Sequence, residues 1–330
     1  MAITIKEINE LRQKTQAGLM DCKKALTEAN GDMEVAMEIL RKKGQLVAAK
    51  RSDREASEGC VLVKVDGQFG AMIALKCETD FVAKNADFVA LAKKIIDLAV
   101  ANRCKTLDEV KALSIDGVPV PEAIINRSGV TGEKMELDGY LTVEGAQVVA
   151  YNHMSQNFLC TLVAFNKACD EEVAKGVAMQ VAAMNPLALN QDAIPQEKKD
   201  SEYKVAVEKT IEEQAQKAVE NALTKAGYNL YLCENDEHLN EGVMKGIITE
   251  EDVVKIRQMK EEVAAQKRAN LPKQMVENIA KGRMAKFFKE SCLLEQAYID
   301  DAKISVAQYL KSADKELTVT AFQRFTLRAE

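Results

Sequence analysis

The chain has 330 residues, of which 47% are hydrophobic and 29% are charged, and its formal net charge is −6. These fractions are typical of a folded globular chain and exclude a wholly disordered one. A mildly acidic chain with 5% aromatic residues and no tryptophan lacks the clustered cations and stacking surfaces of a general nucleic-acid binder, so we expect its partner to be a protein.

Residues 1–50 predict a domain of three short helices. Thr4 and Glu7 form a capping box for the first helix, and Asp32 is the expected cap of the third. Cations at 41–43 before Gly44 predict the end of the third helix, and the charged stretch that follows predicts a linker, with residues 51–56 outside the domain. The expected inward-facing residues are Ile5, Ile8, Leu11, Cys22, Ala25, Leu26, Ala29, Val35, Ala36, Ile39 and Leu40.

From residue 57 the apolar pattern changes to a period of two, which indicates strands. Strands at 61–65 and 71–77 flank the turn at Asp66 and Gly67, and a helix capped by Asn85 follows. Two short helices near 106–113 and 121–127 and a strand pair near 135–143 complete residues 57–144. The order strand, turn, strand, helix then returns over 148–184. The repetition predicts two similar α/β subdomains, residues 57–144 and residues 145–190 with 291–330.

Residues 191–290 predict a helical protrusion. We expect helices at 198–226, 248–270 and 273–290, while 228–246 is left unassigned. Because only Leu271 and Pro272 separate the last two helices, these two are predicted to form an antiparallel coiled-coil hairpin. A further helix near 305–311 and a strand at 319–327 are expected in the second subdomain. The predicted fold class is therefore α+β.

The sequence further predicts a cytoplasmic protein with free thiols. The sequence contains no run of 18 apolar residues, the length needed to span a membrane. The first ten residues lack the features of a secretion signal. The eight cysteines form no CxxC pair, and several lie within apolar runs, where a reduced cysteine behaves as a small buried hydrophobe.

Signatures of enzymes and of nucleotide-binding sites are missing from the sequence. It contains no GxxxxGK[ST], GxGxxG or GxSxG motif and only two histidines, so we predict no cofactor, no metal site and no direct nucleotide binding. A nucleophilic pair of Cys77 and His153 remains an alternative, although a buried structural Cys77 is the favoured interpretation. Covalent catalysis is accordingly the weaker hypothesis.

One segment is hard to explain by packing alone. Residues 77–85, CETDFVAKN, lie between the end of a strand and the cap of a helix. Turn segments are exposed, so Phe81 and Val82 would present apolar side chains to solvent. Two interpretations remain open. Phe81 either folds back onto the following helix, towards Phe88, or acts as an apolar wedge that inserts into a partner.

This segment resembles the signature of bacterial elongation factor Ts, a family of guanine-nucleotide exchange factors for the translational GTPase elongation factor Tu. Residues 11–26 are similar to the first motif of that family, and shorter similar segments are residues 31–32, 40–44, 182–186, 282–284 and 322–325. The resemblance implies an N-terminal ubiquitin-associated-like (UBA-like) three-helix domain, a core of two subdomains and a coiled-coil protrusion.

The resemblance also implies a function and a set of site residues. The chain would bind GDP-bound elongation factor Tu and promote GDP release without covalent chemistry. Thr79, Asp80, Phe81 and Val82 match the segment that dislodges Mg²⁺ from the GTPase. The other matching contact positions are Arg12, Leu19, Met20, Lys23 and His153. The alternative function is a UBA-like adaptor that binds a protein without affecting any nucleotide, and His153 has a purely structural role as its own alternative.

The chain departs from the family pattern in three segments that bear on the site or the protrusion. The helical region near 205–260 is longer than usual. Residues 131–134, TGEK, replace a commoner Gly-Glu-Asn run, and residues 155–159 lack the glycines usual in that turn.

Overall fold

The computed structural model describes residues 3–15 and 17–328. The chain forms two compact units, Met1–Leu189 with Ala297–Glu330 and Asn190–Gln296. It is 56% helical and 19% strand, which confirms the α+β class. No helix in the described ranges is long and apolar enough to cross a lipid bilayer. The finer division of the first unit into domains stays a prediction.

The first unit begins with helices α1 (Ile5–Thr15), α2 (Leu19–Glu28) and α3 (Met33–Lys50). Both predicted caps are confirmed: Glu7 N donates to Thr4 Oγ1 at 3.3 Å while Thr4 N donates to Glu7 Oε2 at 2.8 Å, and Asp32 accepts from two first-turn amides of α3. The sequence pattern also predicts a break at residues 15–18 between the first two helices, and residue 16 of that stretch lies outside the described residues. The small core of this helical domain contains Leu11, Cys22, Leu26 and Ala36.

The predicted end of α3 before Gly44 is wrong, because the helix continues through Gly44 to Lys50. Gly44 is buried where α3 crosses α7 (Val120–Thr131), and a Cβ on Gly129 of α7 would lie 2.6 Å from Gly44 Cα. The glycine therefore permits a close helix crossing instead of ending a helix. The predicted inward positions of Ile5 and Val35 are also wrong, since both side chains are exposed. Three short helices enclose only a small core, so not every apolar position can face it.

The first antiparallel sheet has the order β1-β2-β5, formed by β1 (Glu58–Asp66), β2 (Phe69–Cys77) and β5 (Glu136–Glu144). The predicted turn at Asp66 and Gly67 is confirmed, with Gly67 at φ 59° and Asp66 opposite Phe69. Residues 135–143 were predicted as a strand pair, which is wrong, because β5 is one strand that pairs with β2. Periodicity alone cannot identify the partner of a strand.

Helices and short strands follow the first hairpin. The helix α5 (Ala86–Ala101) has Asn85 as its N-cap, as predicted, and packs on β1 and β2. The remaining elements are α4 (Asp80–Ala83), α6 (Leu107–Lys111), β3 (Ser114–Ile115) and β4 (Val118–Pro119).

The second sheet has the order β10-β7-β6, formed by β6 (Gln147–Asn152), β7 (Leu159–Phe165) and β10 (Val319–Thr326). The helix α8 (Glu171–Met184) packs on β6 and β7, as α5 does on the first sheet. The other elements are η1 (His153–Ser155), β8 (Ala297–Tyr298), β9 (Asp301–Ser305) and α13 (Val306–Ala313).

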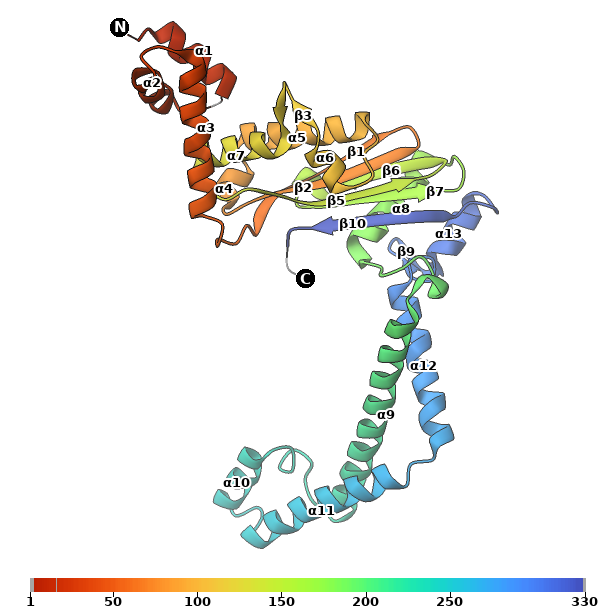
Figure 1. The fold of residues 1–330 in the computed structure, drawn as a ribbon. Coiled ribbons are helices and arrows are strands. Elements are labelled where there is room, and N and C mark those ends of the chain that lie inside the picture. The colour runs from red at the N-terminus through yellow and green to blue at the C-terminus, as the bar shows by residue number, and fades with distance from the viewer. Residues whose placement is uncertain (1–2, 16, 329–330) are drawn as a thin grey trace. The chain divides into compact units, whose positions relative to one another are not determined.

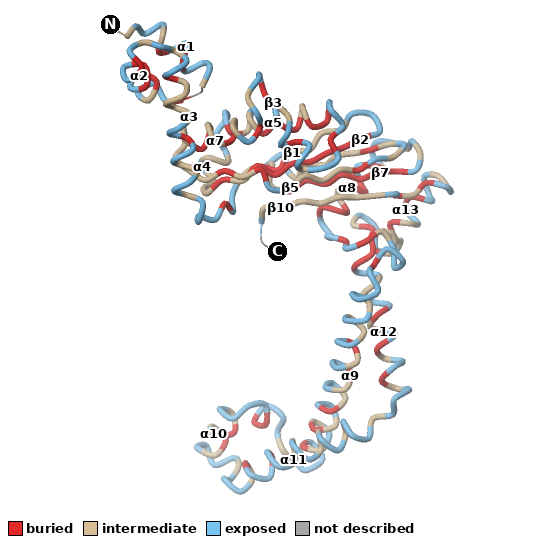
Figure 2. The backbone as a smooth tube through the Cα atoms, viewed as in Figure 1, coloured by how far each residue is buried: buried red, intermediate tan, exposed pale blue. Residues whose placement is uncertain are grey.

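The two sheets pack face to face, with α5 and α8 on their outer faces (Figure 1). Met72, Val148 and Leu162 are among the buried residues between the sheets. Strand β2 is buried on both faces, because Ile73 and Leu75 contact the α5 side while Met72 faces the other sheet. Figure 2 shows buried residues along β2 and β7, the central strands of the two sheets. This buried two-sheet core carries the loops described below.

The second unit is helical and contains η2 (Gln191–Ala193), α9 (Gln196–Lys225), α10 (Asp236–Met244), α11 (Glu250–Ala269) and α12 (Lys273–Ser291). The predicted pairing of the last two helices is wrong, because α11 and α12 each pack mainly on α9 (Figure 1). With 30 residues, α9 is long enough for α11 and α12 to pack against different parts of its length. The unassigned segment contains α10, which closes a small core with Leu223, Leu239 and Ile256.

Candidate functional site

Residues 80–83 form the one-turn helix α4, where the sequence suggested only a turn. Thr79 is its N-cap and accepts a hydrogen bond from Val82 N at 3.4 Å. Phe81 is 84% exposed, whereas Phe88 is fully buried and Val82 packs partly on the core beneath α5. The interpretation that Phe81 folds back towards Phe88 is therefore wrong. Phe81 and Phe88 do not share one continuous helix, because α4 ends at its C-cap Lys84 and α5 begins after its own N-cap, Asn85.

The carboxylate of Glu133 fastens the start of α4 to the core. Its Oε2 accepts hydrogen bonds from Glu78 N and Thr79 N, both at 3.1 Å, and its Oε1 accepts one from Thr79 Oγ1 at 2.6 Å. Ser128 Oγ in turn donates to the Glu133 carbonyl. Sequence reasoning missed this residue as part of the site, and the only signal was its place in the TGEK departure from the family pattern. The exposed Phe81 therefore follows directly after residues that are hydrogen-bonded to the core. We call Glu78, Thr79 and Glu133, which hold the start of α4, the mount of Phe81.

Asp80 is the charged neighbour of Phe81. Its carboxylate lies 2.6 Å from Lys84 Nζ, and the hydrogen bond from Lys84 lowers the pKa of Asp80 below its usual value. The same contact raises the pKa of Lys84. Both groups are therefore charged at neutral pH, and α4 presents an anionic carboxylate beside an exposed aromatic ring.

The structure gives no support to a Cys77 nucleophile. The Cys77 thiol is buried and donates to the Thr79 carbonyl at 3.2 Å, and its burial raises the pKa to about 12. A thiol with that pKa is protonated at neutral pH, whereas the thiolate is the reactive form. The hydrogen bond and ring contacts of His153 are to Tyr151 and Phe158, not to Cys77. All eight cysteines are free.

His153 lies in a strained turn between β6 and β7. Met154, Ser155 and Asn157 have φ values of 52°, 56° and 59°, which non-glycine residues rarely adopt. Two hydrogen bonds close the turn, from Asn152 Nδ2 to Asn157 Oδ1 at 2.6 Å and from Asn157 N to Asn152 Oδ1 at 3.1 Å. These hydrogen bonds stabilise the positive-φ backbone of a turn that lacks the glycines of the family pattern. Met154 of this turn is 70% exposed.

The strained turn and α4 lie at the same end of the two-sheet core. The Asn157 carbonyl accepts a hydrogen bond from Val61 N of β1 at 2.6 Å. The first residue of β1, Glu58, pairs with Cys77, which directly precedes the α4 segment. The structure therefore brings the predicted residues 79–82 and His153 to one end of the core.

The other predicted contact residues belong to the N-terminal helices. Leu19 and Met20, in the first turn of α2, are exposed apolar side chains, and Arg12 of α1 and Lys23 of α2 are exposed cations. No hydrogen bond or ion pair within residues 3–15 and 17–328 joins these four to α4 or to the strained turn. The same part of the chain contains no group of three His, Cys, Asp or Glu side chains that could hold a metal ion.

Comparison with known proteins supplies the class to which this arrangement belongs. A family model described as Elongation factor TS matches residues 78–232 and 238–329. The chain is 60% identical over 330 residues to elongation factor Ts of Bacteroides fragilis and 61% identical over 330 residues to that of Phocaeicola vulgatus. It is 40% identical over 331 residues to the protein of that name from Porphyromonas gingivalis. Each alignment covers 100% of both chains.

The chain is therefore a translation elongation factor. It belongs to the elongation factor Ts family, whose general role is nucleotide exchange on elongation factor Tu, and this role involves no covalent chemistry.

The role of Glu133 can be tested by its removal. Glu133→Ala leaves the amides of Glu78 and Thr79 and the Thr79 hydroxyl without their acceptor, so we expect the free energy of unfolding to fall by about 1–3 kcal/mol. Urea unfolding measures the loss. The matched control is Glu144→Ala, which removes an exposed ion pair with Lys105 and should change stability by less than about 0.5 kcal/mol. Equal stability of the Glu133 variant and the wild type would show that the mount does not depend on this carboxylate.

Proposed function

We propose that the chain binds GDP-bound elongation factor Tu and promotes GDP release by inserting Phe81, with Asp80 beside it, into the GTPase, thereby displacing Mg²⁺. The observation that carries the proposal is the 84% exposure of Phe81 on a helix of one turn that Glu133 fastens to the core. An aromatic side chain held out in solvent costs free energy unless a partner covers it.

The energetics of insertion fit an exchange factor. A GTPase retains GDP through phosphate-binding backbone, a lysine and Mg²⁺, and an exchange factor has to weaken this set without forming a bond. Linkage requires the factor to lower nucleotide affinity by the same free energy by which nucleotide lowers factor affinity. Burial of one Phe side chain supplies about 1.5–3 kcal/mol, which corresponds to roughly a ten- to hundredfold effect on nucleotide affinity.

The residues around Phe81 have separate parts in the proposal. Thr79 caps α4, and Val82 anchors the helix on the core, so Phe81 keeps its outward direction. The anionic Asp80 would enter a site where the GTPase holds a cation and phosphates. His153, placed at the same end of the core and braced by Tyr151 and Phe158, would supply a second contact.

The N-terminal helices would supply affinity. Leu19 and Met20 offer apolar surface, and Arg12 and Lys23 add positive charge to it. Such an apolar pair flanked by cations suits a protein surface with complementary acidic groups. The adaptor alternative shares this surface but assigns no role to Phe81. In this proposal the chain itself binds neither nucleotide nor nucleic acid, and it acts in the cytoplasm.

A fluorescent-GDP release assay with purified elongation factor Tu tests the proposal. We expect the chain to accelerate release, and we expect rising Mg²⁺ concentration to oppose the acceleration, because the ion and the inserted segment compete. An adaptor would bind the GTPase, as gel filtration can show, and leave the release rate at its spontaneous value. Acceleration that does not respond to Mg²⁺ would exclude displacement of the ion as the mechanism.

A further inference from the structure

Residues 51–54, expected to be part of a charged linker, are tied to the base of α4. Helix α3 runs unbroken to Lys50, and Arg51 is its C-cap. Arg51 Nη1 donates hydrogen bonds to both carboxylate oxygens of Glu78, at 3.0 and 2.7 Å. Glu78 directly precedes Thr79, so the end of α3 meets the residue from which the α4 segment starts.

Glu78 is well placed to hold this contact. Its side chain is only 14% exposed, and its Oε1 also accepts a hydrogen bond from Lys134 N at 2.6 Å. Burial opposes ionisation of Glu78, but the hydrogen bonds from Lys134 and Arg51 outweigh it and lower the pKa below its usual value. Glu78 is therefore an anion at neutral pH with two hydrogen-bonding partners, which makes the ion pair more directional than one on an open surface.

A second set of hydrogen bonds connects the same two segments, this time with the donor on Lys134 and the acceptors on the residues after α3. Lys134 Nζ donates to the carbonyls of Ser52 and Arg54, both at 3.0 Å. Residues 51–54 are thus bound to positions 78 and 134. The neighbours of those positions, Thr79 and Glu133, are the residues that hold α4. The end of α3 and the mount of Phe81 therefore share the same two loops.

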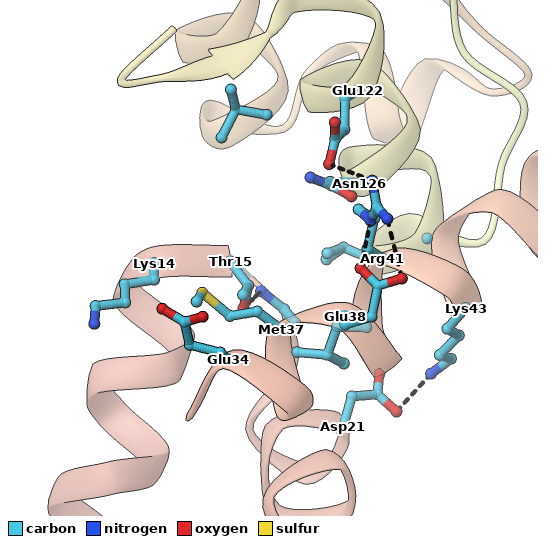
Figure 3. A pocket seen from close by; sticks show the side chains of 15 residues that line it. Lys14, Thr15, Asp21, Glu34, Met37, Glu38, Arg41, Lys43, Glu122 and Asn126 are labelled. Carbon is cyan, nitrogen blue, oxygen red and sulfur yellow. Dashed lines mark hydrogen bonds and ion pairs between the residues drawn. The ribbon is translucent and has the colours of Figure 1, made fainter. Parts of the chain in front are cut away.

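The body of α3 is also held along α7. Beyond the crossing of Gly44 and Gly129, Arg41 Nε donates to Glu38 Oε2 at 2.8 Å, and Arg41 Nη1 lies 3.6 Å from Glu122 Oε1 of α7 (Figure 3). A helix fixed at its side by this crossing and at its end by Arg51 has little freedom to rotate about its axis.

We infer that the Arg51–Glu78 ion pair is a positioning contact that holds α3, and with it the exposed surface of α2, in a set orientation relative to Phe81. The inference rests on the proposed function. When Leu19 and Met20 dock on the GTPase, Phe81 is then already aligned with its insertion site. Insertion therefore proceeds as an intramolecular step at high effective concentration. Without the ion pair, docking continues but fewer complexes have Phe81 inserted.

The test compares Arg51→Met, Glu78→Gln and the double variant in stimulated GDP release as a function of factor concentration. We expect the release rate at saturation to fall about fivefold in each single variant and no further in the double variant, because the two residues act through one contact. The half-saturating concentration should stay within about twofold, since the docking surface is intact. Arg51→Lys keeps the positive charge but lacks the planar guanidinium, so its release rate at saturation should lie between those of Arg51→Met and the wild type.

Two control variants separate positioning from binding and from stability. Lys50→Met removes the adjacent exposed cation, whose side chain forms no ion pair or hydrogen bond within the described residues, and should leave both parameters unchanged. Met20→Ala should raise the half-saturating concentration without lowering the rate at saturation. Amide hydrogen exchange of residues 51–55 should speed up in Arg51→Met but not in Lys50→Met, and this readout needs no partner.

The outcomes are distinct. A rate at saturation equal to that of the wild type in Arg51→Met would overturn the inference. So would a rise in half-saturating concentration alone, which would indicate that Arg51 binds the GTPase directly or that part of the protein is unfolded. Failure of the wild type to accelerate release, or a normal rate with Phe81→Ala, would instead overturn the proposed function.

Discussion

Phe81→Ala is expected to lower the maximal rate of stimulated GDP release by about ten- to hundredfold, because the variant loses the roughly 1.5–3 kcal/mol that burial of the ring supplies in the complex. The melting temperature should stay within about 1 °C of the wild type, since truncation of an exposed side chain leaves no cavity. Stopped-flow release of fluorescent GDP and thermal unfolding, measured on the same preparation, check both halves of this prediction.

Two further variants sharpen the result. Met244→Ala truncates an apolar side chain of similar exposure, 88%, on the second unit, and should change neither quantity. Phe81→Leu keeps much of the apolar surface and should retain an intermediate rate. If Phe81→Ala releases GDP as fast as the wild type, insertion of this ring is not the mechanism. If the variant melts well below the wild type, Phe81 has a structural role that its exposure does not suggest.

Phe88→Ala is expected to have the opposite profile. Phe88 is fully buried in the core between α5 and the first sheet, so its truncation should cost about 3–5 kcal/mol of unfolding free energy. That loss corresponds to a fall in melting temperature of roughly 6–20 °C. At a temperature where the variant is still folded, its maximal rate of stimulated release should be close to that of the wild type. Urea unfolding and the release assay at low temperature measure the two effects.

Phe88→Leu is the control, because it keeps most of the volume and should cost less than about 1.5 kcal/mol. A folded Phe88→Ala variant with a strongly reduced rate would mean that the packing beneath α4 controls the direction of Phe81. The separation of stability from exchange at these two positions would then be wrong.

Several elements were predictable because their signals act over a few residues. The caps at Thr4, Asp32 and Asn85 and the hairpin at Gly67 are all confirmed. A cap or a two-residue turn satisfies backbone groups of its immediate neighbours, so its side-chain chemistry can be recognised in a short window.

The errors arose where a distant partner determined the local structure. The cations at 41–43 followed by Gly44 are typical of a helix end. Helix α3 nevertheless continues, because Gly44 and Gly129 of α7 allow the two helices to come into close contact. The short connection at Leu271 and Pro272 has the appearance of a hairpin, yet α9 is long enough to pack with both neighbouring helices. In each case contacts between elements outweighed the local preference.

The same division applies to the site. The position of residues 77–85 between a strand and a helix cap drew attention to Phe81 and Val82, while only the motif resemblance supplied a role for residues 79–82 and selected His153. The family comparison agrees with the class that this resemblance implied. Only the tertiary structure showed that Phe81 points to solvent and that Glu133 holds its mount. It also showed that Arg51 ties α3 to Glu78. Glu133 and Arg51 are separated by tens of residues from the groups they bind. A charged residue in a sequence carries no information about which distant backbone or carboxylate it will meet, so that choice belongs to the packed fold.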